Sequence, residues 1–175
     1  MAANNWYVIT GASCSGKTTV VSALQKKGYT VVHETARVCI DQGLEEGLTI
    51  EEIRGDERAF QERVLAMKID TEKNLDNQEM VFLDRAIPDT CAYNKLYSAP
   101  DQGVLRSALQ RCAYKKIFIL DQLPYALDYA RTETKEQQDR LHQLLEEAYR
   151  RLNFEIVKVP VLSLKERVEF VLNNV

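Results

Sequence analysis

A run of glycine, lysine and hydroxyl residues near the N-terminus has the residue types and spacing needed to hold phosphates. Residues Gly11-Ala12-Ser13-Cys14-Ser15-Gly16-Lys17-Thr18 match the pattern G-x-x-x-x-G-K-[ST] in full. Glycines let the main chain wrap closely, so that several N–H groups point at phosphate oxygens. Lys17 then reaches the β- and γ-phosphates, and the Thr18 hydroxyl ligates Mg²⁺. The pattern predicts a site for a purine nucleoside triphosphate, which is ATP or alternatively GTP.

The neighbours of this loop support the same interpretation. An apolar strand pattern precedes the loop, and the helical pattern that follows adds the positive end of its dipole. We expect Thr19 to join the eight loop residues in contacting the nucleotide. Cys14 occupies a variable position of the pattern, and we interpret it as a small filling residue in preference to a redox sensor.

An aspartate closes a second apolar strand, Val81-Phe82-Leu83-Asp84. Phosphoryl transfer uses a divalent cation beside the β- and γ-phosphates, with help from an acid on a neighbouring strand. Asp84 is therefore a candidate metal ligand, and the alternative is a strand-end residue that caps the next turn. Arg85 stands where motor-type ATPases usually place a glutamate, and it suits holding a phosphate or an acceptor better than activating water.

A further carboxylate, Glu34, follows the apolar run at 30–33. At this edge it would lie near the γ-phosphate, where it could orient or deprotonate an acceptor hydroxyl. The equally weighted alternative is a helix N-terminal charge favoured by the dipole. Arg37, one helical turn later, is a candidate for binding an anionic group.

A polar segment at 121–133 is too long for a tight connection, and we predict a lid-like loop that closes over the phosphates. Arg131 in this loop would bring positive charge to the transferring group. The alternative is a surface loop with an ordinary arginine.

These candidate site residues can act together only if the fold brings them to the same edge of a β-sheet. Apolar, β-rich runs alternate with helical patterns along the chain. The strand-like runs are 6–10, 30–33, 80–84, 116–120 and 154–159. The helical patterns are 18–27, 56–75, 88–97, 104–112 and 134–152, with a last one beginning at Ser163. This order predicts an α/β sandwich whose ligands bind outside the carboxyl ends of parallel strands.

Size and composition narrow the choice of partners. The chain has 175 residues, the length of a single domain, and a net charge of −3 that argues against nucleic acid as the main partner. No apolar run approaches the roughly 20 residues that cross a bilayer. Four scattered cysteines without a C-x-x-C pair and only two histidines make a zinc site improbable, and free thiols fit the cytoplasm.

These segments resemble an ATPase family that carries the AAA label and groups with nucleoside and nucleotide kinases. The matching segments are 11–19, 33–37 (His-Glu-Thr-Ala-Arg), 82–89 (Phe-Leu-Asp-Arg-Ala-Ile-Pro-Asp), 131–133 (Arg-Thr-Glu) and Pro160. Relatives in this group include the ribosylnicotinamide kinase domain of a bifunctional NAD-salvage protein and the eukaryotic TRPL translocation defect protein.

The resemblance implies a P-loop NTPase three-layer sandwich with a five-stranded parallel sheet, spanning residues 1–175 as one kinase-like domain. It also implies an acceptor site between Glu34 and the Asp84–Arg85 pair, with Arg37 and Asp89 nearby, and a lid that carries Arg131. The catalytic set that we predict is Lys17, Glu34, Arg85 and Arg131, with Thr18 and Asp84 holding Mg²⁺.

Three functions fit these observations. The first is a Mg²⁺-dependent kinase that transfers a phosphoryl group from ATP to a nucleoside, a nucleotide or a riboside. The second is a nucleotide-dependent switch or slow NTPase that acts through a protein or lipid partner, because the eukaryotic relative is thought to bind GTP and phospholipid. The third, a nucleic-acid 5′-end kinase, would require a basic groove. A guanine-reading N-K-x-D motif is not formed, because residues 94–97 read Asn-Lys-Leu-Tyr.

Overall fold

Five parallel strands form the centre of the fold, as the sequence predicts. The computed structural model describes residues 4–100, 103–124 and 134–175. The order across the sheet is β2-β3-β1-β4-β5, so β1 lies in the middle. The strands are β1 (Trp6–Thr10), β2 (Thr30–Val32), β3 (Val81–Asp84), β4 (Lys116–Leu120) and β5 (Ile156–Val159).

The register of the strands aligns the residues that the sequence singled out. Ile9 of β1 is paired with Asp84 of β3, and Val32 of β2 is paired with Leu83. The phosphate-loop pattern, which begins at Gly11, and Glu34 therefore leave the sheet at the same edge as Asp84. This is the carboxyl edge, where ligands bind in open parallel sheets.

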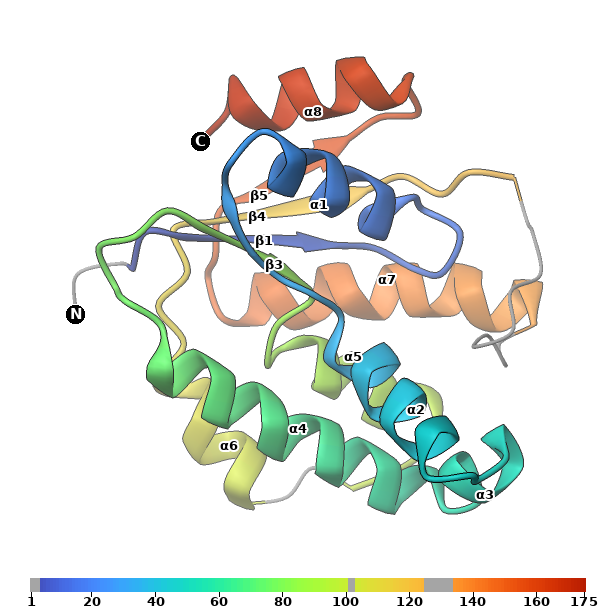
Figure 1. Ribbon diagram of the computed structural model, residues 1–175. Coiled ribbons are helices and arrows are strands. Elements are labelled where there is room, and N and C mark those ends of the chain that lie inside the picture. The colour runs from blue at the N-terminus through green and yellow to red at the C-terminus, as the bar shows by residue number, and fades with distance from the viewer. Residues whose placement is uncertain (1–3, 101–102, 125–133) are drawn as a thin grey trace.

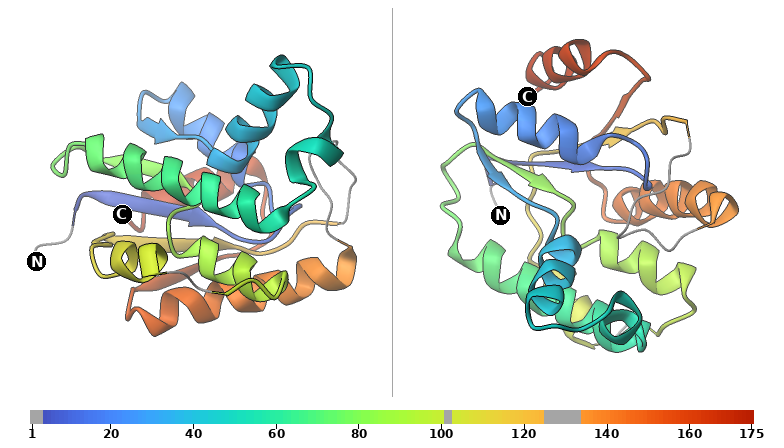
Figure 2. Two further views of the ribbon diagram at one scale, coloured as in Figure 1. Left: turned by 90° about the horizontal axis from the view of Figure 1, so that it is seen from below. Right: turned by 45° about the vertical axis from the view of Figure 1, so that its right-hand side comes forward.

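Helices cover both faces of the sheet (Figure 1). Helices α1 and α8 lie on one face, and α4, α5, α6 and α7 lie on the other (Figures 1 and 2). Helices α2 and α3 extend beyond the sheet beside α4 (Figure 1). The helices are α1 (Lys17–Lys26), α2 (Thr35–Glu45), α3 (Ile50–Arg54), α4 (Glu57–Asn74), α5 (Asp89–Leu96), α6 (Gly103–Leu109), α7 (Lys135–Arg151) and α8 (Leu164–Leu172).

The alternating side chains of the central strand feed two separate cores. Tyr7 and Ile9 of β1 pack with the apolar faces of α1 and α8, while Trp6 and Val8 pack on the opposite face. All four side chains are buried. Burying each such side chain contributes roughly 1.5–3 kcal/mol, so both helical layers are fixed firmly to the strand from which the phosphate loop departs.

Helix boundaries follow the signals in the sequence with two exceptions. Capping boxes begin α7 at Thr134 and α8 at Ser163, as the spacing of hydroxyl and acidic or amide residues predicts. Helices α2 and α3 are absent from the helical patterns predicted above; α3 has only 5 residues, whereas α2 has 11. A capping box at Thr49 begins α3 and was the available signal. Among the described helices, none is long and apolar enough to span a membrane.

Candidate active site

The phosphate-loop segment forms a tight turn between β1 and α1. Gly11 has φ +144°, and a Cβ there would lie 2.7 Å from the Leu120 carbonyl oxygen, so the position requires glycine. Gly16 and Cys14 also have positive φ, at 77° and 61°. The Lys17 ammonium donates to the Ala12 carbonyl at 2.9 Å and to Ser15 Oγ at 3.4 Å, which places its charge over the loop.

The Thr18 hydroxyl and Asp84 meet across the gap between α1 and β3. Thr18 Oγ1 donates to Asp84 Oδ2 at 3.1 Å. The other oxygen, Oδ1, is buried, and no described group lies within hydrogen-bonding distance of it. Burial, and then repulsion from Glu34, raises the pKa of Asp84 to about 6. A buried carboxylate oxygen without a partner beside a hydroxyl fits Mg²⁺, which prefers oxygen ligands.

Glu34 and Arg85 form an ion pair at the same edge. Arg85 Nε donates to Glu34 Oε1 at 2.7 Å, and the guanidinium lies 5.1 Å from the centre of the Tyr93 ring. Glu34 is the N-cap residue of α2, but its side chain makes no capping hydrogen bond. Burial alone would raise the pKa of Glu34, yet the adjacent Arg85, together with Lys17, holds it well below its usual range. Glu34 is thus a stable carboxylate with a weak affinity for protons.

Arg85 adopts a strained main-chain conformation with φ +68°. Such a conformation costs a non-glycine residue roughly 1–3 kcal/mol and concentrates at functional sites. The surrounding contacts maintain it: Arg85 N donates to the Ile9 carbonyl at 3.0 Å, and Lys68 Nζ donates to the next carbonyl, that of Ala86, also at 3.0 Å. The guanidinium is therefore directed to Glu34 by a fixed backbone.

Asp89 lies behind this ion pair and is fully buried. Its Oδ1 accepts hydrogen bonds from Thr10 Oγ1 at 2.5 Å and from Arg85 Nη1 at 3.3 Å. Its Oδ2 accepts from the Ala86 amide at 2.9 Å and from the Tyr149 hydroxyl. These contacts leave Asp89 no access to a ligand, which favours a supporting role over the substrate contact that we expected.

One cleft collects most of the predicted site residues. It has about 120 Å³ of space accessible to water, and its walls come from the phosphate loop, α1, α2, α3, α4 and α5. The predicted residues that line it are Ser13, Cys14, Gly16, Lys17, Thr18, Thr19, Glu34, Arg37 and Arg85. Asp84 reaches the cleft through its bond to Thr18. Arg131 lies outside the described residues, as does most of the expected lid.

The start of the 121–133 segment contacts the phosphate loop. The Leu123 amide donates to the Cys14 carbonyl at 2.9 Å. Arg167 of α8 donates to the Ser15 carbonyl at 2.5 Å and to the Asp121 carbonyl at 3.0 Å. The loop is thereby held by two parts of the chain that are remote from it in sequence.

The model of a family described as an AAA domain matches residues 6–167. The chain belongs to this family. Among curated proteins there was no match.

Solved structures share the fold of this AAA domain. Deoxyadenosine kinase from M. mycoides, with the products dcmp and a flexible dcdp bound, has a TM-score of 0.66 and 17% identity over 97% of both chains. NadR protein in complex with NR has a TM-score of 0.71 and 18% identity over 96% of this chain and 49% of that one. Thymidylate kinase from Candida albicans has a TM-score of 0.70 and 16% identity, covering 99% and 92%. The AAA domain here thus spans about half of the NadR chain.

Several cleft residues of the AAA domain were not predicted from its sequence. They are Ala36, Ile40, Arg54, Phe60, Gln61, Val64, Lys68 and Tyr93. A signal for Lys68 and Gln61 was present, because both lie on the same side of α4 as the apolar Phe60 and Val64. A charged or amide residue within a buried stripe is a sign of function. Arg167 gave no comparable signal, since its contacts depend on how α8 docks.

Proposed function

We propose that this protein is a Mg²⁺-dependent kinase that transfers the γ-phosphoryl group of ATP, or alternatively GTP, to a small acceptor. The acceptor class is a nucleoside, a nucleotide or a riboside. The supporting observation is that the Lys17–Thr18–Asp84 group and the Glu34–Arg85 pair adjoin one cleft. A nucleotide on the loop and an acceptor beside Glu34 would therefore meet there.

Different residues would bind the phosphates, hold the metal and stabilise the transferring group. The loop amides and Lys17 would hold the phosphates, while Thr18 and Asp84 would hold Mg²⁺, which neutralises charge on the β- and γ-oxygens when bound. Arg85, and Arg131 of the 121–133 segment, would supply positive charge to the moving group. The acceptor oxygen forms a bond to the γ-phosphorus, the bond to the bridging oxygen breaks, and its electron pair leaves with the nucleoside diphosphate. Where the acceptor is a hydroxyl, Glu34 would orient it through a hydrogen bond and the hydroxyl proton would pass to solvent, because Glu34 has a weak affinity for protons.

A nucleotide-dependent switch acting on a protein or lipid partner is the second candidate. The same phosphate loop would serve it, but the partly buried Glu34–Arg85 pair would have no assigned task. We also propose that the protein works in the cytoplasm, where four free thiols would stay reduced.

Labelled ATP and a panel of nucleosides, nucleotides and ribosides test the proposal. We expect acceptor-dependent transfer of the label that requires Mg²⁺. Lys17→Ala should abolish transfer and weaken nucleotide binding by about tenfold or more, because the ammonium would form charge-assisted contacts with the phosphates. Lys26→Ala, an exposed change on the same helix, is the control. Nucleotide binding without acceptor-dependent turnover would support the switch. Unchanged affinity and rate in Lys17→Ala would contradict the phosphate-loop assignment.

A further inference from the structure

The charges around the cleft are unequal in sign. Its charged lining residues are Lys17, Arg37, Arg54, Lys68 and Arg85 on the positive side and Glu34 on the negative side, counted over the described residues. We infer that the acceptor already carries an anionic group, a phosphate or a carboxylate, when it enters this cleft. The inference rests on the proposed kinase function and narrows its acceptor.

Lys68 gives the strongest support for an anionic acceptor. It projects from α4, its side chain is buried, and within the described residues its ammonium donates to one acceptor, the Ala86 carbonyl at 3.0 Å. An ammonium has three protons to donate, and burying a charge is costly unless it is paired. Burial lowers the pKa of Lys68 although the nearby Asp89 acts to raise it, and an anion in the cleft would act in the same direction as Asp89. The geometry thus provides a buried donor at the wall of the acceptor space.

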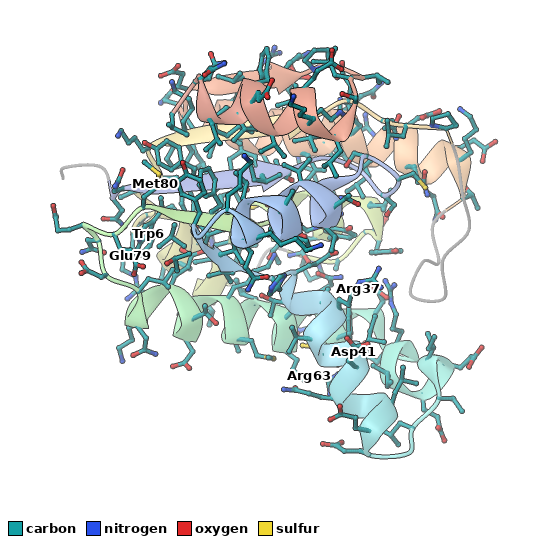
Figure 3. All side chains as sticks on the ribbon, turned by 45° about the horizontal axis from the view of Figure 1, so that its top comes forward. Trp6, Arg37, Asp41, Arg63, Glu79 and Met80 are labelled. Carbon is teal, nitrogen blue, oxygen red and sulfur yellow. The ribbon has the colours of Figure 1, made fainter. Side chains whose placement is uncertain are left out.

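The other cations of the cleft come from separate elements and converge on the same space. Arg37 lies on α2 one turn after Glu34, and Figure 3 shows it on the same helix as Asp41. Arg54 of α3 is held by Glu57 with N–O distances of 2.9 Å. A neutral sugar or base would gain little from this set of charges, whereas an anion would form charge-assisted hydrogen bonds with it.

The state of Glu34 agrees with an anionic acceptor oxygen. Arg85 and Lys17 hold the pKa of this carboxyl low against the effect of burial, so Glu34 is a poor base. A phosphate oxygen is already deprotonated near pH 7 and needs no base. It would attack the γ-phosphorus directly, forming the new P–O bond while the nucleoside diphosphate leaves with the electron pair, and no proton has to move.

A series of acceptors that differ in charge tests the inference on the full-length protein. The series compares each of the common nucleosides with its 5′-monophosphate, and nicotinamide riboside, a cation, with nicotinic acid riboside, which adds one carboxylate. Labelled ATP reports transfer. We expect kcat/KM for the anionic member to exceed that of its partner by roughly tenfold or more. The nucleotide pairs and the riboside pair distinguish a phosphate from a carboxylate.

Lys68→Met then tests the residue. It keeps the length of the side chain and removes the charge, and we expect it to lower kcat/KM for the anionic acceptor by roughly ten- to a hundredfold, with a smaller loss for the uncharged one. Lys68→Arg should restore most of the preference. Lys73→Met, an exposed change on the same helix, is the matched control. Arg37→Gln gives an independent reading of the charge preference if Lys68→Met proves too unstable to assay.

The outcomes separate the inference from the function on which it rests. Preferential transfer to the neutral or cationic members would overturn the inference and leave the kinase proposal standing. An equal loss for every acceptor in Lys68→Met would show that Lys68 acts only by holding the Ala86 carbonyl, which overturns its role in charge selection. No transfer to any member would end both proposals.

Discussion

Glu34 and Arg85 form an ion pair between the start of α2 and the end of β3. Glu34 is the N-cap residue of α2, but its side chain makes no capping hydrogen bond. Arg85, which contacts Glu34, has a strained backbone with positive φ. Two interpretations of Glu34 were equally weighted from the sequence, a site carboxylate and a helix-end charge. Its 2.7 Å contact with Arg85 favours the first.

Glu34→Gln should slow phosphoryl transfer roughly tenfold or more while leaving the affinity for ATP within about twofold, because the change removes the charge that orients Arg85 and the acceptor but does not alter the loop. Steady-state kinetics with ATP varied at saturating acceptor, and the reverse, would measure the two effects. Glu45→Gln, exposed on the same helix, is the control. An unaffected rate would return Glu34 to a structural role.

At the scale of elements, the junction of β3 and α5 determines where Arg85 points. Asp89, the first residue of α5, joins the end of β1 through Thr10 and joins α7 through Tyr149. Burial would raise the pKa of Asp89, but the nearby Lys68 and Arg85 keep it below its usual value. One buried carboxylate therefore connects three elements that meet behind the cleft.

Asp89→Asn should destabilise the protein by roughly 3–5 kcal/mol, because it removes one partner of a buried ion pair and turns an amide donor toward groups that need an acceptor. Urea unfolding would measure this loss. Asp70→Asn, exposed on α4, should change stability by less than about 0.5 kcal/mol. A loss below about 1 kcal/mol in Asp89→Asn would show that the network is dispensable.

Some positions in the site follow from the order of strands and helices in the sequence, and others depend on how the helices pack. Residues at the ends of strands were located correctly relative to one another, because parallel strands present their carboxyl ends at one edge. Asp84, which ends β3, and Glu34, which lies two residues after β2, belong to this group, whereas Lys17 was located by the phosphate-loop pattern that follows β1. Lys68 was missed although its position among the apolar residues of α4 was a signal, because that pattern does not show that α4 packs against the residues after β3. The burial of Asp89 was missed for a similar reason, since its partners come from β1 and α7.

At the scale of the whole molecule, the packing of α4 against the sheet includes a partly buried acid. Glu72 accepts hydrogen bonds from the Tyr114 hydroxyl at 2.8 and 2.9 Å, and that hydroxyl also accepts from the Ile87 amide at 3.4 Å. Burial raises the pKa of Glu72 from 4.5 to about 7, despite the hydrogen bond from Tyr114 and the charge of Lys68. The folded state therefore binds a proton here more tightly than the unfolded state does.

Stability should fall as the pH rises from about 4.5 to about 7 through this group, because in that window the folded protein carries a proton that the unfolded chain has lost. Above pH 7 the whole of this contribution, up to about 3 kcal/mol of the free energy of unfolding, has been lost. Glu72→Gln should remove it, so the variant should gain stability relative to the parent protein at pH 8 and not at pH 4.

Urea unfolding at both pH values would measure the difference for Glu72→Gln. Glu62→Gln, exposed on the same helix, serves as the control. A parallel stability curve for Glu72→Gln and the parent protein across this range would contradict the assignment.

Arg167 connects helix α8 to the phosphate loop, which lies near the opposite end of the sequence. Its guanidinium donates to the carbonyls of Ser15, Asp121 and Pro160. The docking of α8 on the rest of the protein and the binding of a nucleotide to the phosphate loop are therefore two linked equilibria. If docking of α8 tightens the grip on a triphosphate, occupancy by that triphosphate must tighten the docking of α8 by the same factor. Shortening the chain from its C-terminal end would then act as an affinity mutation, although no deleted atom would touch the nucleotide.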